Sequence, residues 1–171
     1  EIKSEKYSVK DTPALINGYI TFGTLNNIAK ITDEVISIWA EILNNVDNSK
    51  IFVESPGFHQ RDFVRDFTKR FQRFGIAKDR VVLRNRDPNL QYIRYSEIDI
   101  ALDPFPFGGG TTTCDALWMG MPLVTLSGES SMVRRTQSRQ FSHVSPTMPA
   151  MRSMFTFGKS AFVIHSHARY T

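Results

Sequence analysis

The sequence predicts an α/β protein built on a parallel sheet with helices on both faces. Two observations predict it. Short runs rich in β-branched and aromatic residues alternate with longer segments whose apolar residues recur every three or four positions, and glycine or proline stands between them. Strands that alternate with helices form βαβ units, in which the strands are parallel and helices cover the sheet.

Each element has its own signal. Strands are expected over residues 18–23, 50–54, 81–83, 98–102 and 122–126. Helices are expected over residues 33–46, 59–74, 89–96 and 111–119. Thr32 is the expected N-cap of the first helix. The second helix spaces its phenylalanines four, four and three residues apart and stops before Gly75. Beyond residue 140 the pattern weakens, and only residues 160–165 read as a strand.

Charge and composition exclude several classes of protein. The chain of 171 residues has a formal charge of +4 and a pI near 9.3, which suggests a nucleic-acid partner. However, residues 1–129 carry a net charge of −2, and the acid-free residues 130–171 carry +6. We therefore expect no nucleic-acid partner.

No apolar run approaches the about 20 residues that span a bilayer, so no membrane association is expected. The N-terminal residues lack the apolar core of a signal peptide, and the single Cys114 favours a reducing, cytoplasmic location.

A glycine loop between an expected strand and an expected helix gives the strongest local signal. Residues 102–113 read LDPFPFGGGTTT. The loop follows the carboxyl end of an expected strand, where ligands bind to parallel sheets. The free N–H groups and the dipole at the start of a helix attract anions. The loop predicts a phosphate site as readily as a plain flexible loop with a threonine cap. Asp115 on the first helical turn can accept from ribose hydroxyls, although alone it is better explained by the helix dipole.

The loop after the first expected strand reaches the same edge. Lys30 can neutralise a phosphate and Asn27 can bond a nucleotide or sugar, but solvated lysines and turn-forming asparagines are common. Asp99 is expected to be a structural or capping group. We expect Cys114 to be packed and inert, and the residue spacing predicts no metal site.

These segments together resemble the bacterial relatives of O-GlcNAc transferase, a group of inverting glycosyltransferases. The resemblance lies in residues 13–27 with Lys30, and in residues 98–126, IDIALDPFPFGGGTTTCDALWMGMPLVTL. It extends over about residues 13–140, with Arg134 and Ser138 fitting the family's next motif. It implies a Rossmann-like sheet that forms the C-terminal domain of a GT-B glycosyltransferase. The implied division is a linker at 1–17, a UDP-sugar-binding domain at 18–140 and a divergent basic tail at 141–171.

The resemblance also implies a metal-independent site for a UDP-sugar. Lys30 corresponds to the lysine on the diphosphate and is the implied catalytic residue. Asp115 corresponds to the ribose-binding carboxylate. Gln91 stands where the family usually has a histidine near the base. The remaining implied UDP-binding residues are Asn27, Arg86 in the loop that meets the uracil, and Gly109, Gly110, Thr111 and Thr112 at the helix start.

The implied function is transfer of N-acetylglucosamine to Ser or Thr hydroxyls. Protein acceptors would bind through N-terminal regions that this sequence lacks, among them tetratricopeptide repeats. Two alternatives stay open. One is a related enzyme that transfers a hexose from UDP to asparagine. The other is a truncated or frameshifted remnant that at most binds nucleotide or a partner, because the sequence departs from the family after about Phe141. For the implied function, we expect the fragment alone to bind UDP weakly and to transfer no sugar.

Overall fold

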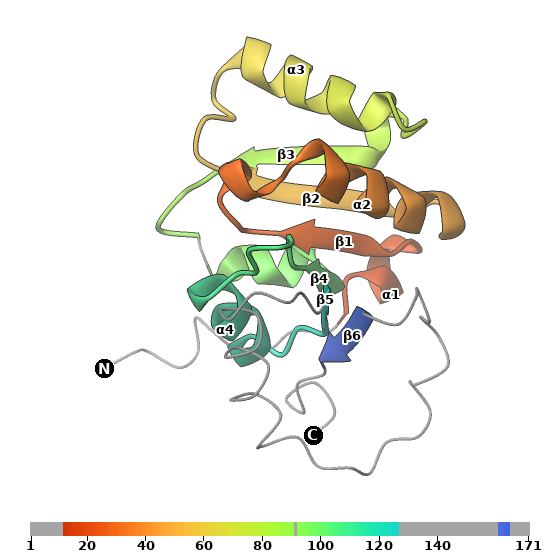
Figure 1. The fold of residues 1–171 in the computed structure, drawn as a ribbon. Coiled ribbons are helices and arrows are strands. Elements are labelled where there is room, and N and C mark those ends of the chain that lie inside the picture. The colour runs from red at the N-terminus through yellow and green to blue at the C-terminus, as the bar shows by residue number, and fades with distance from the viewer. Residues whose placement is uncertain (1–11, 91, 127–160, 165–171) are drawn as a thin grey trace.

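The computed structural model describes residues 12–90, 92–126 and 161–164. A single sheet runs through this part of the chain, with its strands in the order β3-β2-β1-β4-β5-β6 (Figure 1). The strands are β1 (Thr21–Thr24), β2 (Lys50–Ser55), β3 (Val81–Asn85), β4 (Ile100–Leu102), β5 (Leu123–Leu126) and β6 (Ala161–Ile164). β1 to β5 are parallel, as predicted, and β6 pairs antiparallel with β5.

Helices connect the parallel strands, and one helical turn precedes the first of them. They are α1 (Ala14–Asn17), α2 (Asp33–Asn45), α3 (Arg61–Gln72) and α4 (Thr111–Trp118), with 3₁₀ helices η2 (Ile28–Lys30), η3 (Lys78–Arg80) and η4 (Ile93–Glu97). Two elements differ from expectation. The helix expected over 89–96 is the 3₁₀ helix η4, which begins later because the chain after Pro88 first forms turns. The turn of α1 falls in the expected linker, and its short sequence has no amphipathic period that could predict it.

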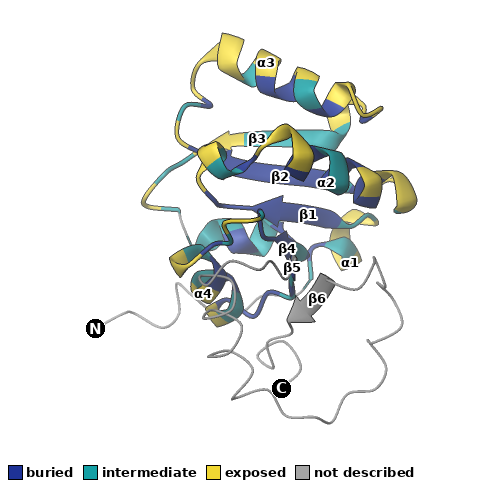
Figure 2. Cartoon of the chain, in the orientation of Figure 1, coloured by how far each residue is buried: buried dark blue, intermediate teal, exposed yellow. Residues whose placement is uncertain are grey.

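The sheet has a separate apolar cluster on each face, because neighbouring side chains of a strand point to opposite sides. On β2, Ile51 and Val53 pack in the cluster with α2 and α3. Phe52, between them, packs in the cluster with α4 and η4. Figure 2 shows β1 and β2 buried along their length, with the outer turns of α2 and α3 exposed. The prediction of helices on both faces is confirmed.

Asp99, directly before β4, joins the sheet to α1. Its buried carboxylate accepts from the backbone N–H groups of Ala14, at 2.8 Å, and Thr21, at 2.7 Å. Because backbone donors occupy both of its oxygens, Asp99 is a structural group, as the sequence predicted.

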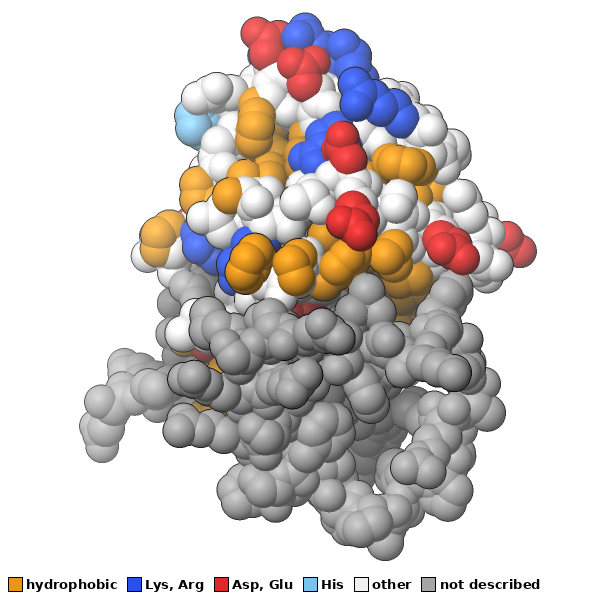
Figure 3. Space-filling view, viewed as in Figure 1, with side chains coloured by type: hydrophobic (Ala, Val, Ile, Leu, Met, Phe, Trp, Pro, Cys, Tyr) orange, Lys and Arg blue, Asp and Glu red, His pale blue; other side chains and the backbone are white. Residues whose placement is uncertain are grey.

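Surface charge in the described residues is mixed rather than basic. Figure 3 shows side chains of both signs over α3, where Arg65 pairs with Asp62 and Asp66. Within the described ranges, no helix is long and apolar enough to cross a membrane.

Candidate functional site

In open parallel sheets, ligands bind in the crevice outside the carboxyl ends of the strands where the strand order reverses, and in this sheet that place is the carboxyl ends of β1 and β4. β1 lies between β2 and β4, and the chain reaches β2 by one crossover and β4 only after β3. Loops at such a reversal point separate and leave room for a ligand. Here they are the loop Leu25–Lys30 after β1 and the loop Asp103–Gly110 after β4.

A buried network centred on Asp103 holds these two loops together. Asp103 Oδ1 accepts from the N–H of Gly109 at 2.6 Å and from Asn26 Nδ2 at 3.3 Å. Its Oδ2 accepts from the hydroxyls of Thr113, at 3.3 Å, and Thr125, at 3.4 Å. Thr112 closes the network by donating to Asn26 Oδ1 at 2.9 Å. The carboxylate thus fixes β1, β4, β5 and α4 to one another.

The network explains the pKa of Asp103. Burial raises the pKa of this carboxyl above its ordinary value, because a charged group loses hydration inside the protein. The Gly109 N–H, the Thr113 hydroxyl, the Lys30 charge and Asn26 oppose that rise. Asp103 is therefore buried away from solvent, and both of its carboxylate oxygens accept hydrogen bonds from neighbouring residues.

The start of α4 is open toward the crevice. Gly110 is the N-cap, and no described side chain caps it. The first N–H groups of an α-helix have no partners inside the helix. Gly110 and Thr111 are exposed, Thr112 is half-buried and Gly109 is buried. Donors directed outward with the positive end of a helix dipole behind them suit an anion.

Lys30 crosses from one loop to the other. Its Nζ donates to the carbonyl of Gly108 at 2.9 Å, and the residue is half-buried. The ammonium group therefore lies beside the glycine loop that leads into α4. A positive charge next to an uncapped helix start strengthens the same preference for an anion.

The other predicted residues lie around this centre. Asn27 is exposed and caps η2, since its Oδ1 accepts from the N–H of Ala29 at 2.9 Å. Asp115 is half-buried on α4, as its fifth residue, so the expectation that it lies on the first turn was wrong. Its charge helps burial to raise the pKa of Tyr95. Arg86 turns its side chain toward the first loop, where Nη2 donates to the carbonyl of Leu25 at 2.9 Å. Gln91 lies outside the described residues.

Sequence reasoning missed the residues that organise the crevice. No structural role was predicted for Asn26, Thr113 or Thr125, and none for Asp103 beyond its place at a strand end. An aspartate directly after a buried strand, with three glycines five to seven residues further on, is the signal that could have found it. The expectation that Cys114 is packed was wrong: the residue is exposed on α4. Among the described residues no group of three or more His, Cys, Asp or Glu could hold a metal ion.

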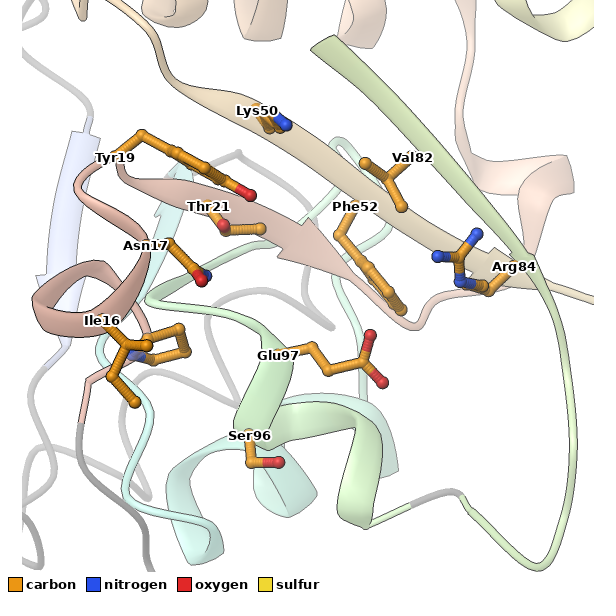
Figure 4. A pocket seen from close by; sticks show the side chains of 11 residues that line it. Ile16, Asn17, Tyr19, Thr21, Lys50, Phe52, Val82, Arg84, Ser96 and Glu97 are labelled. Carbon is orange, nitrogen blue, oxygen red and sulfur yellow. The ribbon is translucent and has the colours of Figure 1, made fainter. Parts of the chain in front are cut away.

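A cavity of about 790 Å³ lies elsewhere, against the sheet face between α1, β3 and η4 (Figure 4). Tyr19, Lys50 and Phe52 line it together with Arg84 and Glu97. None of the predicted nucleotide-site residues lines it. The cavity is therefore distinct from the crevice at the carboxyl ends of β1 and β4.

Solved structures share this fold. A structure titled Thermobaculum terrenum O-GlcNAc transferase mutant K341M superposes with a TM-score of 0.68 at 32% identity, over 72% of this chain and 24% of that one. The C-terminal domain of a glycosyl transferase group 1 family protein (LpcC) from Francisella tularensis superposes with a TM-score of 0.52 at 15% identity, over 72% of this chain and 69% of that one. The fold is a Rossmann-like domain of the kind that forms the C-terminal half of a GT-B glycosyltransferase.

The chain belongs to glycosyl transferase family 41, whose family model matches residues 5–152. Two plant proteins, from Eustoma exaltatum subsp. russellianum and Arabidopsis thaliana, are each 43% identical to it over 125 and 122 residues. Both are described as probable UDP-N-acetylglucosamine--peptide N-acetylglucosaminyltransferase SPINDLY. The matches cover 70% and 68% of this chain but 13% of each relative, so the chain spans about one eighth of their length.

Proposed function

We propose that this chain is the UDP-sugar-binding portion of an inverting protein glycosyltransferase that transfers N-acetylglucosamine to Ser or Thr hydroxyls. The observation that carries the proposal is the Asp103 network, because it fixes the loop of Lys30 against the glycine loop at an uncapped helix start. Membership of family 41 and the names of the plant relatives supply the chemical class. The division into a linker at 1–17, a binding domain at 18–140 and a tail at 141–171 belongs to the same proposal.

Residues at the crevice would share the work of binding UDP. The N–H groups of Gly110, Thr111 and Thr112 and the Lys30 ammonium would bind the diphosphate, with Lys30 exchanging the Gly108 carbonyl for a phosphate oxygen. Gly109, whose N–H donates to Asp103, would shape the loop around the diphosphate. Asp115 would accept from the ribose hydroxyls. Asn27, the Arg86 loop and Gln91 would bound the nucleoside.

Catalysis in this half would be electrostatic. As the bond between sugar and diphosphate breaks, negative charge develops on the leaving UDP, and donors fixed in advance stabilise it. Lys30 and the α4 start supply this stabilisation without a metal ion. The acceptor protein, and the base that takes its hydroxyl proton, would bind or lie in other parts of the whole protein. The cytoplasmic location remains part of the proposal, supported by the single cysteine of this chain.

Calorimetric titration with UDP tests the proposal. Hydrogen bonds to charged groups contribute about 1.5–3 kcal/mol, so Lys30→Ala should weaken UDP binding by about tenfold or more, and Asp115→Ala should also weaken it. Lys50→Ala is the matched control, because Lys50 lies over the Tyr19 ring at the opposite end of the strands. We expect this variant to bind like the unaltered chain. UDP binding that depends on Lys50 and not on Lys30 would place the ligand in the cavity of Figure 4 and refute the site.

A further inference from the structure

The short helix η2 carries Lys30, and its position depends on contacts with other elements. η2 has only three residues, Ile28–Lys30, and a 3₁₀ turn of this length has few hydrogen bonds of its own to hold it. The Asp103 network binds Asn26, four residues before Lys30, and Lys30 reaches the glycine loop through its long side chain. The backbone of Lys30 therefore needs support from outside the crevice.

Ser55 supports the start of η2. It is the last residue of β2 and is 1% exposed. Its Oγ accepts from the N–H of Ile28 at 3.2 Å. The first N–H groups of a helix have no partners inside it, and Asn27 Oδ1 accepts from the next of them, that of Ala29, at 2.9 Å. Ser55 and Asn27 together satisfy the first two donors of η2.

Arg70 supports the other end of η2. It lies in the last turn of α3, and its guanidinium group contacts the residues that join η2 to α2. Nη2 donates to the carbonyl of Ile31, directly after Lys30, at 2.7 Å, and Nε donates to Asp33 Oδ1 at 2.6 Å. The Arg70 side chain is 25% exposed, and its Cζ lies 5.1 Å from the centre of the Phe67 ring. Packing against this ring limits the directions that the guanidinium group can take.

We propose that Arg70 and Ser55 are positioning residues for Lys30: they hold the two ends of η2, so that the Lys30 ammonium stays beside the start of α4. The inference rests on the proposed UDP site and adds two residues that would act on the ligand only through Lys30. Neither lies on the two loops of the crevice, since one comes from β2 and the other from α3. A binding group is effective when its neighbours hold it within about 0.5 Å of the productive geometry.

Calorimetric titration of the 171-residue chain with UDP tests the inference. Arg70→Met keeps an extended side chain and removes every donor, so we expect it to weaken UDP binding by about threefold to tenfold. Ser55→Ala removes the acceptor at the start of η2 and should weaken binding by a similar factor. Arg65→Met is the matched control, because Arg65 lies on the same helix and pairs with Asp62 and Asp66 of that helix. It should change UDP affinity by less than about twofold.

A double-mutant cycle separates positioning from a general structural effect. If Arg70 acts through Lys30, Arg70→Met should weaken UDP binding by less than about twofold when Lys30 has already been replaced by alanine. A substitution that disturbs the whole site would instead weaken binding by the same factor in both backgrounds.

Hydrogen exchange without any ligand gives an independent readout. The N–H of Ile31 closes η2 by donating to the carbonyl of Ile28 at 2.9 Å. This amide should exchange faster in Arg70→Met than in the unaltered chain or in Arg65→Met, while the amides of β1 should exchange at the same rate in all three. Unchanged exchange at Ile31 in Arg70→Met would contradict the support at that end of η2.

The outcomes are distinct. If Lys30→Ala weakens UDP binding while Arg70→Met and Ser55→Ala bind UDP like the unaltered chain, the inference is wrong and the UDP site stands. Unaltered affinity in one of the two variants removes that residue from the proposal, and equal losses in both backgrounds of the cycle overturn it. If Arg70→Met does not fold, Ser55→Ala is measured in the same cycle and decides by the same criteria. Absence of UDP binding in the unaltered chain, or binding that does not depend on Lys30, overturns both the proposed site and the inference.

Discussion

The three consecutive glycines differ in what surrounds them. None of the three has a positive φ, so left-handed backbone does not explain them. A Cβ at Gly109 would lie closer than 3.0 Å to the hydroxyls of Thr112 and Thr113 and to the Asp103 carboxylate, whereas a Cβ at Gly110 meets nothing within 4 Å. Gly109 is therefore required by close packing.

This difference predicts a matched pair of variants. Gly109→Ala should lower the free energy of unfolding by about 1–3 kcal/mol, the range for overpacking a well-packed site. Gly110→Ala should stay within about 0.5 kcal/mol, as exposed substitutions usually do. Urea denaturation of the two variants measures this. Equal losses would mean that the loop does not have the packing described.

Asp103 should make stability depend on pH in a definite direction. Its pKa is raised above the ordinary 3.8, so the folded protein binds this proton more tightly than the unfolded chain. The associated stability is fully present below the unfolded pKa and is lost as pH rises through the folded pKa, by about 1.4 kcal/mol for each unit of the rise. Asp103→Asn keeps an acceptor for the Gly109 N–H and removes the titration.

The measurement compares the two proteins by urea denaturation between pH 4 and pH 8. The free energy of unfolding of the unaltered chain minus that of Asp103→Asn should fall as pH rises and then become constant. A difference that increases with pH would show that the pKa of Asp103 is lowered in the folded protein.

At the residue scale, the sequence predicts the position of the candidate site but not the contacts that hold its two loops together. Lys30 and the glycine loop follow strands, and parallel strands end at a common edge, so their proximity could be predicted. The contact between Asn26 and Asp103 joins residues far apart in sequence, and nothing local distinguishes Asn26 from Asn27. The role of Arg86 could not be predicted, because the direction of a long side chain depends on packing around it.

At the scale of elements, helix α2 shows how local signals fixed the fold. The predicted cap is present, with Thr32 Oγ1 accepting from the N–H of Val35 at 3.3 Å. Thr32→Ala should therefore lower the free energy of unfolding by about 1 kcal/mol. Ser37→Ala on the same helix is the control, because Ser37 donates to the Glu34 carbonyl and caps no free N–H. Thermal unfolding followed by circular dichroism compares them, and an equal effect of both variants would contradict the capping role.

Elements were predictable where a periodic pattern and its stop signals agreed. α3 has three phenylalanines on one stripe, Phe63, Phe67 and Phe71, and these rings pack together with Phe58. Phe74 and Gly75 lie beyond its end. α1 and η4 are too short to show a period, so their form depends on tertiary contacts such as the bonds from Asp99. The strand predicted near residues 160–165 is present as β6, whereas its antiparallel pairing with β5 was not predictable from alternation alone.

At the scale of the whole molecule, the two apolar clusters stabilise one sheet whose carboxyl edge carries the candidate site. The described carboxylates on the glycine loop and on α4 are Asp103 and Asp115. Asp103 is buried and accepts from four donors, so it cannot take a proton from an acceptor hydroxyl. Asp115 is assigned to the ribose in the proposed site. In the proposed site, the described residues would stabilise the leaving group, and neither of these two carboxylates would serve as the base.

This division of labour predicts that the 171-residue chain binds UDP and transfers no sugar on its own. General base catalysis contributes about 10²–10⁴-fold to rate, and positioning of the acceptor contributes further, so loss of both should bring transfer below detection. The measurement incubates the chain with labelled UDP-N-acetylglucosamine and a Ser/Thr-containing protein, with one of the longer family 41 relatives as the active control. Label transferred by the chain alone, and abolished by Lys30→Ala, would show that both the base and the acceptor site lie within these residues.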